Sequence, residues 1–236
     1  MKKKVLIFID WFTPGFKAGG PIKSVTNIIN SLNKFYDFHI VTSDRDINDQ
    51  TAYNNIQINS WITKEKHKII YLSPNKRDEW ILNHLKEVSY DAYYFNSIFS
   101  KYFTLKPLLL LNKYCPNKKI IVAPRGMLGK GALAIKPLKK QVFLFLAKII
   151  GYFKNVTWHA TDTEEAEDIQ LAFGKKANIY NSPNISILNI EETHLIKEEN
   201  ELKLVFFSRI SQKKNLFYAL EVLKNFTHKN VSLAIY

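Results

Sequence analysis

The sequence predicts an α/β protein built on a doubly wound parallel sheet, followed by an incomplete second unit of the same kind. Short apolar runs alternate with helical patterns along almost the whole chain, which is typical of parallel strands covered by helices. The 236 residues are 46% hydrophobic, enough to bury one large core or two smaller ones. A single cysteine excludes an internal disulfide framework, so the fold must rest on its apolar core.

The strands of the first sheet are expected at seven short apolar runs, each bounded by polar or turn residues. In chain order these runs are KVLIFID, FHIVTS, KIIYL, DAYYF, KKIIVA, VTWHA and ANIY. Between them lie five stretches with apolar residues three and four positions apart, the spacing of a helix with one buried face. These helices are expected at residues 21–34, 77–88, 101–114, 137–154 and 163–173.

A break in this alternation, the acidic segment 185–201, indicates a linker between a first domain at 1–184 and a second domain. Residues 202–236 contain a strand LKLVFF, a helix LFYALEVLKNF and a strand VSLAIY. One such unit cannot cover both faces of a parallel sheet. We therefore expect either a fragment of a longer protein or a unit that docks on the first domain or on a partner.

The formal net charge of +13 predicts a surface that attracts anions such as nucleotide phosphates, lipid headgroups or nucleic acid. No zinc-ligand spacing, RNA-recognition motif or helix-turn-helix pattern accompanies the lysines, so nucleic acid is not the expected partner. The amino terminus shows no signal-peptide cleavage site, and the most apolar segment, 142–153, is interrupted by Lys148 and too short to span a bilayer. We expect a cytoplasmic protein.

The loop FTPGFKAGGPIKS connects the first strand to the first helix. Ligands of open α/β sheets bind at the carboxyl ends of the strands, where this loop lies. Gly19 and Gly20 remove side chains there and Pro21 suits a first helical turn, which leaves backbone N–H groups free for an anion. A plain glycine turn explains the same residues, and the dinucleotide fingerprint G-x-G-x-x-G is absent.

Basic residues also follow two other strands. Arg125, in APRGMLGKGAL, is suited to clamp a phosphate or stabilise developing negative charge, with an ion pair to a nearby carboxylate as the alternative. Arg209 and Lys214 flank the turn SRISQKKN of the second unit, where two cations and a helix N-terminus suit a diphosphate. A solvated basic turn is the alternative there.

Three other features have structural explanations that we favour. The D-x-D pattern in SDRD, residues 43–46, matches a carboxylate pair that holds metals, but it fits a turn after a strand better. In HATDTEEAED, Asp162 suits a helix N-cap with Glu165 at the third helical position. The helix at 137–154 is apolar around most of its circumference, which favours burial in the core over binding to an anionic membrane.

Taken in order, five motifs carry a resemblance to a known family. They are GGPIKSVTNIINSL, APRGMLGKGAL, HATDTEEAEDI, IYNSPNI and LVFFSRISQKKNLFYALEVL, which together cover nearly the whole chain. This set resembles the retaining glycosyltransferases of the GT-B fold, specifically glycosyltransferase family 4. The resemblance implies a Rossmann-like acceptor-binding domain at 1–184 and the first β-α-β unit of a nucleotide-sugar domain at 202–236. It also places Gly19 and Gly20 in the cleft, near the donor phosphates.

The resemblance further implies the roles of the basic residues. Arg209 and Lys214 match the pair that holds the donor diphosphate and stabilises it as the leaving group, so neither a metal nor another cofactor is expected. Arg125 stands where many family members have a histidine, so its role is electrostatic or in positioning the acceptor. Two departures from the family are that SPNIS replaces P-N-G and that the later E-x7-E segment is absent.

The function that this resemblance implies is transfer of a sugar, with retention, from a nucleoside-diphosphate sugar to a glycan or lipid-linked acceptor in surface polysaccharide synthesis. Peripheral contact with an anionic membrane, at its inner face, is part of that expectation. The alternative is a truncated, non-catalytic paralogue that binds a glycan or nucleotide and needs a partner. A basic module that binds nucleic acid is a third hypothesis, which requires binding that weakens steeply with salt.

Overall fold

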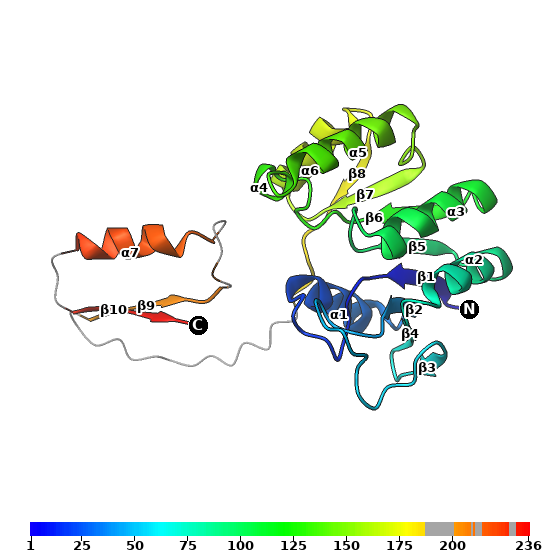
Figure 1. The fold of residues 1–236 in the computed structure, drawn as a ribbon, viewed down its shortest axis with the longest axis horizontal. Coiled ribbons are helices and arrows are strands. Elements are labelled where there is room, and N and C mark those ends of the chain that lie inside the picture. Colours follow the sequence, from blue (N-terminus) through cyan, green and yellow to red (C-terminus); the bar gives the residue numbers. More distant parts are fainter. Residues whose placement is uncertain (187–200, 209, 211–213, 227–229) are drawn as a thin grey trace. The chain divides into compact units, whose positions relative to one another are not determined.

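The computed structural model describes residues 1–186, 201–208, 210, 214–226 and 230–236. The chain divides into two compact units, Met1–Ile187 and Leu188–Tyr236, and each is described here by itself. Figure 1 shows the elements of both units in chain order. Most of the linker predicted at 185–201 lies outside the described residues.

The first unit is built on an eight-stranded sheet with the order β3-β4-β2-β1-β5-β6-β7-β8. Neighbouring strands are parallel, except that β3 runs antiparallel to β4 at one edge. This arrangement confirms the predicted α/β class, and every one of the seven predicted runs forms a strand. The strands are β1 (Lys3–Phe8), β2 (Tyr36–Ser43), β3 (Trp61–Thr63), β4 (His67–Leu72), β5 (Ala92–Phe95), β6 (Lys119–Val122), β7 (Val156–Ala160) and β8 (Asn178–Asn181).

The helices cover the two faces of this sheet unequally (Figure 1). They are α1 (Gly20–Leu32), α2 (Arg77–Glu87), the π-helical turn η1 (Lys101–Leu105), α3 (Lys106–Tyr114), α4 (Lys130–Leu133), α5 (Pro137–Ile149) and α6 (Thr163–Phe173). Residues of α2, η1, α3, α5 and α6 share one core with Phe8, Phe95 and Trp158 of the sheet. The core on the other face takes its helical residues from α1, which packs on Ile7 and Ile40.

A groove of about 430 Å³ marks the face of the sheet that α1 leaves open. Its apolar walls come from α1 and from the strands beside it, and the segment Ser182–Ile185 closes one side. The side-chain amide of Asn27 on α1 donates a hydrogen bond to the carbonyl oxygen of Ile185 at 2.7 Å. The expectation that helices cover both faces therefore holds only for the strands under α1. The apolar residues that α1 and the strands contribute to the groove include Val5, Ile28, Leu32, Phe38, Ala92 and Ile121.

The expected burial of the helix at 137–154 is wrong for most of its length. Only Leu144 and Ala147 of α5 are buried, and the helix ends at Ile149. A helix packed on one face of a sheet presents about half of its circumference to the core, and no second layer of described residues covers the rest. The apolar side chains that remain exposed on α5 are Leu138, Val142, Phe145, Leu146 and Ile149.

The second unit contains β9 (Leu202–Phe206), α7 (Leu216–Lys224) and β10 (Val231–Ile235). The two strands pair in parallel, so the unit is the expected single β-α-β crossover. No residue of α7 is buried, since two strands offer the helix too small a surface to pack on. None of the helices that the structure describes, in either unit, is long and apolar enough to cross a membrane.

Candidate functional site

The parallel strands all end on the same side of the sheet. We call this border, formed by the carboxyl ends of the strands, the carboxyl edge. The loop with Gly19 and Gly20 follows β1 at this edge, and the loop with Arg125 follows β6. The structure therefore brings these three predicted residues to the same side of the first unit. Lys214 belongs to the second unit, and Arg209 lies outside the described residues.

Gly19 and Gly20 are exposed and begin α1. Gly19 is the N-cap residue, with φ of 66° and ψ of −115°, a conformation open mainly to glycine. No side chain caps the helix and its first turn has no acidic residue, so the positive end of the helix dipole is uncompensated. A Cβ atom on Gly20 would meet nothing within 4 Å, so the space in front of this helix end is open.

Asp46 holds the glycine loop in place. Its carboxylate accepts hydrogen bonds from the backbone N–H groups of Phe16 at 2.7 Å, Lys17 at 3.0 Å and Ile47 at 2.8 Å. Burial opposes the charge, but the backbone donors outweigh burial and lower the pKa of Asp46. The other acid of the D-x-D pattern, Asp44, is buried and receives two hydrogen bonds from its neighbour, at 2.9 and 3.1 Å.

The D-x-D acids thus serve the turn that we expected, in which Asp44 pairs with Arg45. Among the described residues no three histidines, cysteines or acids gather as metal ligands would. Sequence reasoning missed Gly15 in the same loop. A Cβ atom there would lie 2.2 Å from the hydroxyl oxygen of Tyr53 and 3.0 Å from the carbonyl oxygen of Phe12, so only glycine fits.

Arg125 is fixed by three hydrogen bonds to partners from different parts of the chain. Its Nε donates to Asn96 Oδ1 at 2.7 Å, and its two terminal nitrogens donate to Asn184 Oδ1 at 2.6 Å and to the hydroxyl of Tyr94 at 2.8 Å. All three partners are neutral, and within the described part of the chain Arg125 does not form the ion pair with a carboxylate that we weighed as an alternative. These three bonds hold the guanidinium in a fixed orientation at the carboxyl edge.

His159 extends this network behind Arg125. The hydroxyl of Tyr94 lies 2.8 Å from His159 Nδ1, and His159 Nε2 lies 2.9 Å from the carbonyl oxygen of Ser182. Because a carbonyl only accepts, Nε2 carries the proton and Nδ1 accepts from Tyr94, whose oxygen accepts in turn from Arg125. Burial lowers the pKa of His159, and the charge of Arg125 lowers it further. The imidazole is therefore neutral at physiological pH.

Glu165 ties the Arg125 loop to α6. Its Oε1 accepts from the backbone N–H of Gly126 at 2.7 Å, and its Oε2 accepts from the N–H and the hydroxyl of Thr161 at 2.8 and 2.7 Å. Asp162 is the N-cap of α6 and accepts from the Glu165 N–H at 2.7 Å, as predicted. Asp162 and Glu165 are thus structural, and Glu165 holds the loop that carries Arg125 at the edge.

Asp10, just beyond β1, is a partly buried acid at the carboxyl edge that sequence reasoning did not single out. Its carboxylate accepts from the hydroxyls of Ser100 at 2.5 Å and Ser97 at 3.2 Å. Burial raises its pKa, while these hydroxyls and the nearby charge of Arg77 oppose that rise. The available signal was an acid directly after a buried strand. Its partners Ser97 and Ser100, which follow β5 in the chain, could not be predicted from the sequence.

Lys214 is exposed and lies directly before α7, at the carboxyl end of β9. The N-cap residue Asn215 gives no side-chain hydrogen bond to the helix, and the first turn contains no acid. The start of α7 therefore joins an uncompensated helix dipole to a lysine charge, a combination that attracts a phosphate group.

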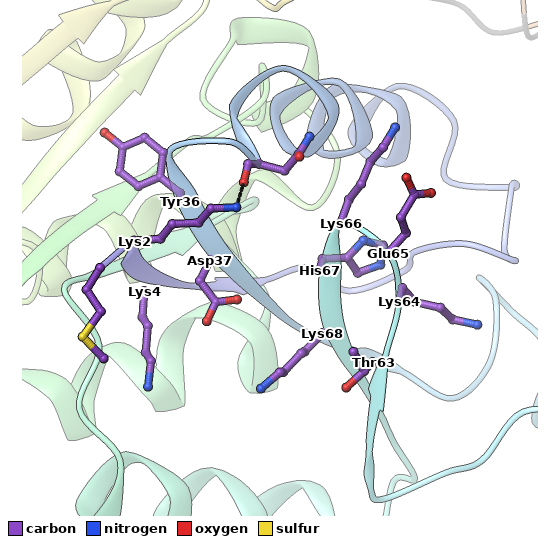
Figure 2. Close-up of a pocket in the computed structure, with 12 residues that line it drawn as sticks. Lys2, Lys4, Tyr36, Asp37, Thr63, Lys64, Glu65, Lys66, His67 and Lys68 are labelled. Atoms are coloured by element: carbon purple, nitrogen blue, oxygen red, sulfur yellow. Dashed lines mark hydrogen bonds between the residues drawn. The ribbon is translucent and has the colours of Figure 1, made fainter.

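A separate basic pocket of about 360 Å³ lies opposite the carboxyl edge, at the amino-terminal ends of β1, β2 and β4. Figure 2 shows that its lysines do not converge: Lys4 and Lys68 extend one way and Lys66 extends the other. Lys2 is used locally and donates to the carbonyl oxygen of Asn33 at 2.7 Å. This pocket has the charge for an anion but lacks the focused geometry of the Arg125 network.

Neither a protein-family model nor a curated protein matches the chain. Solved structures do match. The Anabaena protein Alr3699/HepE in complex with UDP-glucose has a TM-score of 0.62 and 13% identity, over 99% of this chain and 60% of HepE. The lipopolysaccharide outer core galactosyltransferase WaaB matches with a TM-score of 0.57 and 16% identity, over 98% of this chain and 60% of WaaB. The trehalose-6-phosphate synthase OtsA matches with a TM-score of 0.53 and 11% identity, over 99% of this chain and 64% of OtsA.

The chain shares their Rossmann-like GT-B fold. It spans about 60% of the length of these proteins. In this fold the carboxyl edge with Gly19, Gly20 and Arg125 is where a ligand of the first unit is expected, in keeping with the general rule for open α/β sheets.

Proposed function

We propose that this chain is part of a glycosyltransferase that moves a sugar from a nucleoside-diphosphate sugar to an acceptor. The observation that carries the proposal is the fold shared over nearly the whole chain with HepE, crystallised with UDP-glucose, and with the galactosyltransferase WaaB. The motif resemblance to retaining family 4 enzymes adds retention of configuration. It also adds surface polysaccharide synthesis on a glycan or lipid-linked acceptor.

The chemistry of such a transfer explains the basic residues. Cleaving the sugar–phosphate bond develops positive charge on the sugar and negative charge on the departing diphosphate, so fixed cations beside the diphosphate lower the barrier. We assign this task to Arg209 and Lys214, with the start of α7 adding its dipole. No metal is needed in this scheme, because the side-chain cations take the role of a Lewis acid.

Arg125 and the glycine loop are proposed to serve the acceptor side. The guanidinium is already oriented by Asn96, Tyr94 and Asn184, so it would act without reorganisation when a substrate binds. Gly19 and Gly20 leave the start of α1 open to a donor phosphate or to the acceptor. We place the protein in the cytoplasm, with peripheral contact to the inner face of an anionic membrane.

Donor binding tests the proposal. The protein isolated from its native source is screened by thermal shift against UDP-, GDP- and ADP-sugars, with each free nucleoside diphosphate as a control. We expect one donor class to raise the melting temperature, because a ligand that binds only the folded state stabilises that state. If no nucleotide sugar shifts the melting temperature at millimolar concentration, the donor assignment is wrong.

A further inference from the structure

The outward face of α5 is a continuous apolar stripe. Leu138, Val142, Phe145 and Ile149 follow one another at spacings of four, three and four residues, so they lie along one side of the helix. Leu138 is 74% exposed, Phe145 64% and Ile149 65%. Leu146 broadens the stripe in the middle. The inner face of the helix is already packed through Leu144 and Ala147, so the stripe is not a misplaced core face.

Along the chain, the residues on either side of this stripe carry charge of a single sign. No aspartate or glutamate occurs between Asp91 and Asp162, a stretch that holds Arg125 and eleven lysines. Lys136, Lys139 and Lys148 lie on or beside α5 and are exposed. None of these three ammonium groups has an ion-pair or hydrogen-bond partner among the residues that the structure describes.

We propose that α5 is a docking surface that lies in the interface of an anionic lipid bilayer, with the stripe among the acyl chains and the lysines at the headgroups. A helix that presents exposed aromatic and aliphatic residues between basic ones is typical of this mode of binding. The negative surface potential of anionic lipids attracts each lysine, and this adds to the burial of the stripe.

A second copy of the chain fits the stripe less well. Pairing two copies through α5 would bring Lys139 and Lys148 of one copy towards those of the other, and α5 itself carries no carboxylate to neutralise them. A bilayer rich in phosphate headgroups supplies both the apolar phase and the opposite charge. The occupant that matches the stripe and its charge together is therefore the anionic membrane.

The topology connects this surface to the carboxyl edge. α5 follows β6 through the Arg125 loop and α4, and it precedes β7, which is parallel to β6. The helix therefore begins near the carboxyl edge and runs back towards the opposite edge. Docking through α5 deepens the membrane contact of the proposed function, since it brings the Arg125 loop towards lipid-linked acceptors. That consequence rests on the proposed function, whereas the docking surface itself does not.

Flotation with vesicles tests the docking surface without any sugar donor. The full chain is mixed with vesicles of phosphatidylcholine alone or with added phosphatidylglycerol, and the vesicle-bound fraction is measured at low and high salt. The variant carries Phe145→Glu and Ile149→Glu together. The matched control is Phe35→Glu, which changes a side chain that is 67% exposed but lies between α1 and β2, well away from α5 in the sheet order.

We expect the parent and Phe35→Glu to float with phosphatidylglycerol vesicles and to be released by salt. The double variant should lose at least about tenfold in apparent affinity, because two charges enter the apolar face. Circular dichroism melts should be the same for all three proteins. Absence of binding by the parent, equal binding to neutral vesicles, or unchanged binding by the double variant overturns the proposal. If the parent is a dimer and the double variant is a monomer, the stripe binds a second copy of the chain instead.

Discussion

At the scale of single residues, Arg125 illustrates what sequence can and cannot reveal. Its place after a strand was readable, and that position predicted a cation at the carboxyl edge. Its partners were not readable, because Tyr94, Asn96 and Asn184 are 29 or more positions away in the chain. The fixed orientation of the guanidinium, which decides how it acts on a substrate, emerges only from the fold.

This orientation leads to a prediction for Arg125→Lys. A lysine keeps the charge but has one nitrogen in place of three, so Asn96 and the buried hydroxyl of Tyr94 lose a donor. We expect the free energy of unfolding to fall by about 1–3 kcal/mol in urea titrations. The control Asn184→Ala removes only an exposed partner and should cost less than about 0.5 kcal/mol. Equal stability of Arg125→Lys and the parent would show that the network does not hold the loop.

The glycines give a second prediction at this scale. Gly15→Ala forces a Cβ atom against the Tyr53 hydroxyl and the Phe12 carbonyl, so it should destabilise the fold by about 1–3 kcal/mol. Gly131→Ala in α4 meets nothing within 4 Å, and it should be neutral or stabilise by up to about 1 kcal/mol. Thermal melts of the two variants, compared with the parent, check the difference in sign. Similar melting temperatures for both would contradict the packing of this loop.

At the scale of elements, a partly buried histidine network joins β2 to α2. His39 Nδ1 and His84 Nε2 lie 3.1 and 2.9 Å from the hydroxyl of Tyr90, and His39 Nε2 lies 3.2 Å from the carboxylate of Asp37. Asp37 accepts from His39 Nε2, so Tyr90 donates to His39 and accepts from His84. The bond that Tyr90 donates to His39 Nδ1 requires a neutral imidazole, because a protonated ring has no nitrogen that accepts. Trp80 stacks on His84 with ring centroids 4.2 Å apart and covers it.

This network makes stability depend on pH. Burial, together with a smaller effect of the neighbouring His39, lowers the pKa of His84 from 6.5 to about 4. A histidine with a lowered pKa stabilises the fold fully above pH 6.5, and this contribution is lost as the pH falls towards 4. We expect the free energy of unfolding to drop by about 2 kcal/mol between pH 7.5 and 4.5.

The variant His84→Phe isolates this contribution, because it keeps a ring against Trp80 but removes the titrating group. Its urea midpoint should be lower than that of the parent at pH 7.5 and should change less with pH. If the urea midpoint of the parent rises as the pH falls, the predicted direction of the pH dependence is wrong. If His84→Phe shows the same pH dependence as the parent, the effect arises from other titrating groups, such as His39.

The elements also show where pattern reasoning ends. Seven strands and five helical regions could be predicted because the spacing of apolar residues indicates which face of an element is buried. The three-residue β3 lacks the length for a pattern, and α4 is a single turn. The burial expected for α5 was wrong, because apolar residues around a helix do not reveal whether a second layer exists to cover them.

At the scale of the whole molecule, the fold class followed from alternation alone and is confirmed by the sheet and by the solved structures of the same fold. The carboxyl edge followed from the general rule for parallel sheets. The unequal covering of the sheet did not follow from the sequence, because it depends on which face each crossover takes. The net charge of +13 can be read from the sequence as a number, but its meaning depends on its distribution, and residues 92–161, which include α5, contain no aspartate or glutamate.

Sugar transfer itself is the central claim, and acceptor-dependent release of nucleoside diphosphate measures it most directly. The assay uses the protein isolated from its native source, its best donor from the thermal-shift screen, and membrane extracts as the source of acceptor. We predict release by the parent, with a fall of at least about tenfold in Lys214→Ala, since loss of one diphosphate contact costs more than about 1.4 kcal/mol of transition-state stabilisation. Lys214 is exposed, so the melting temperature should not change. Absence of release by the parent, or kinetics in Lys214→Ala equal to those of the parent, would contradict the account.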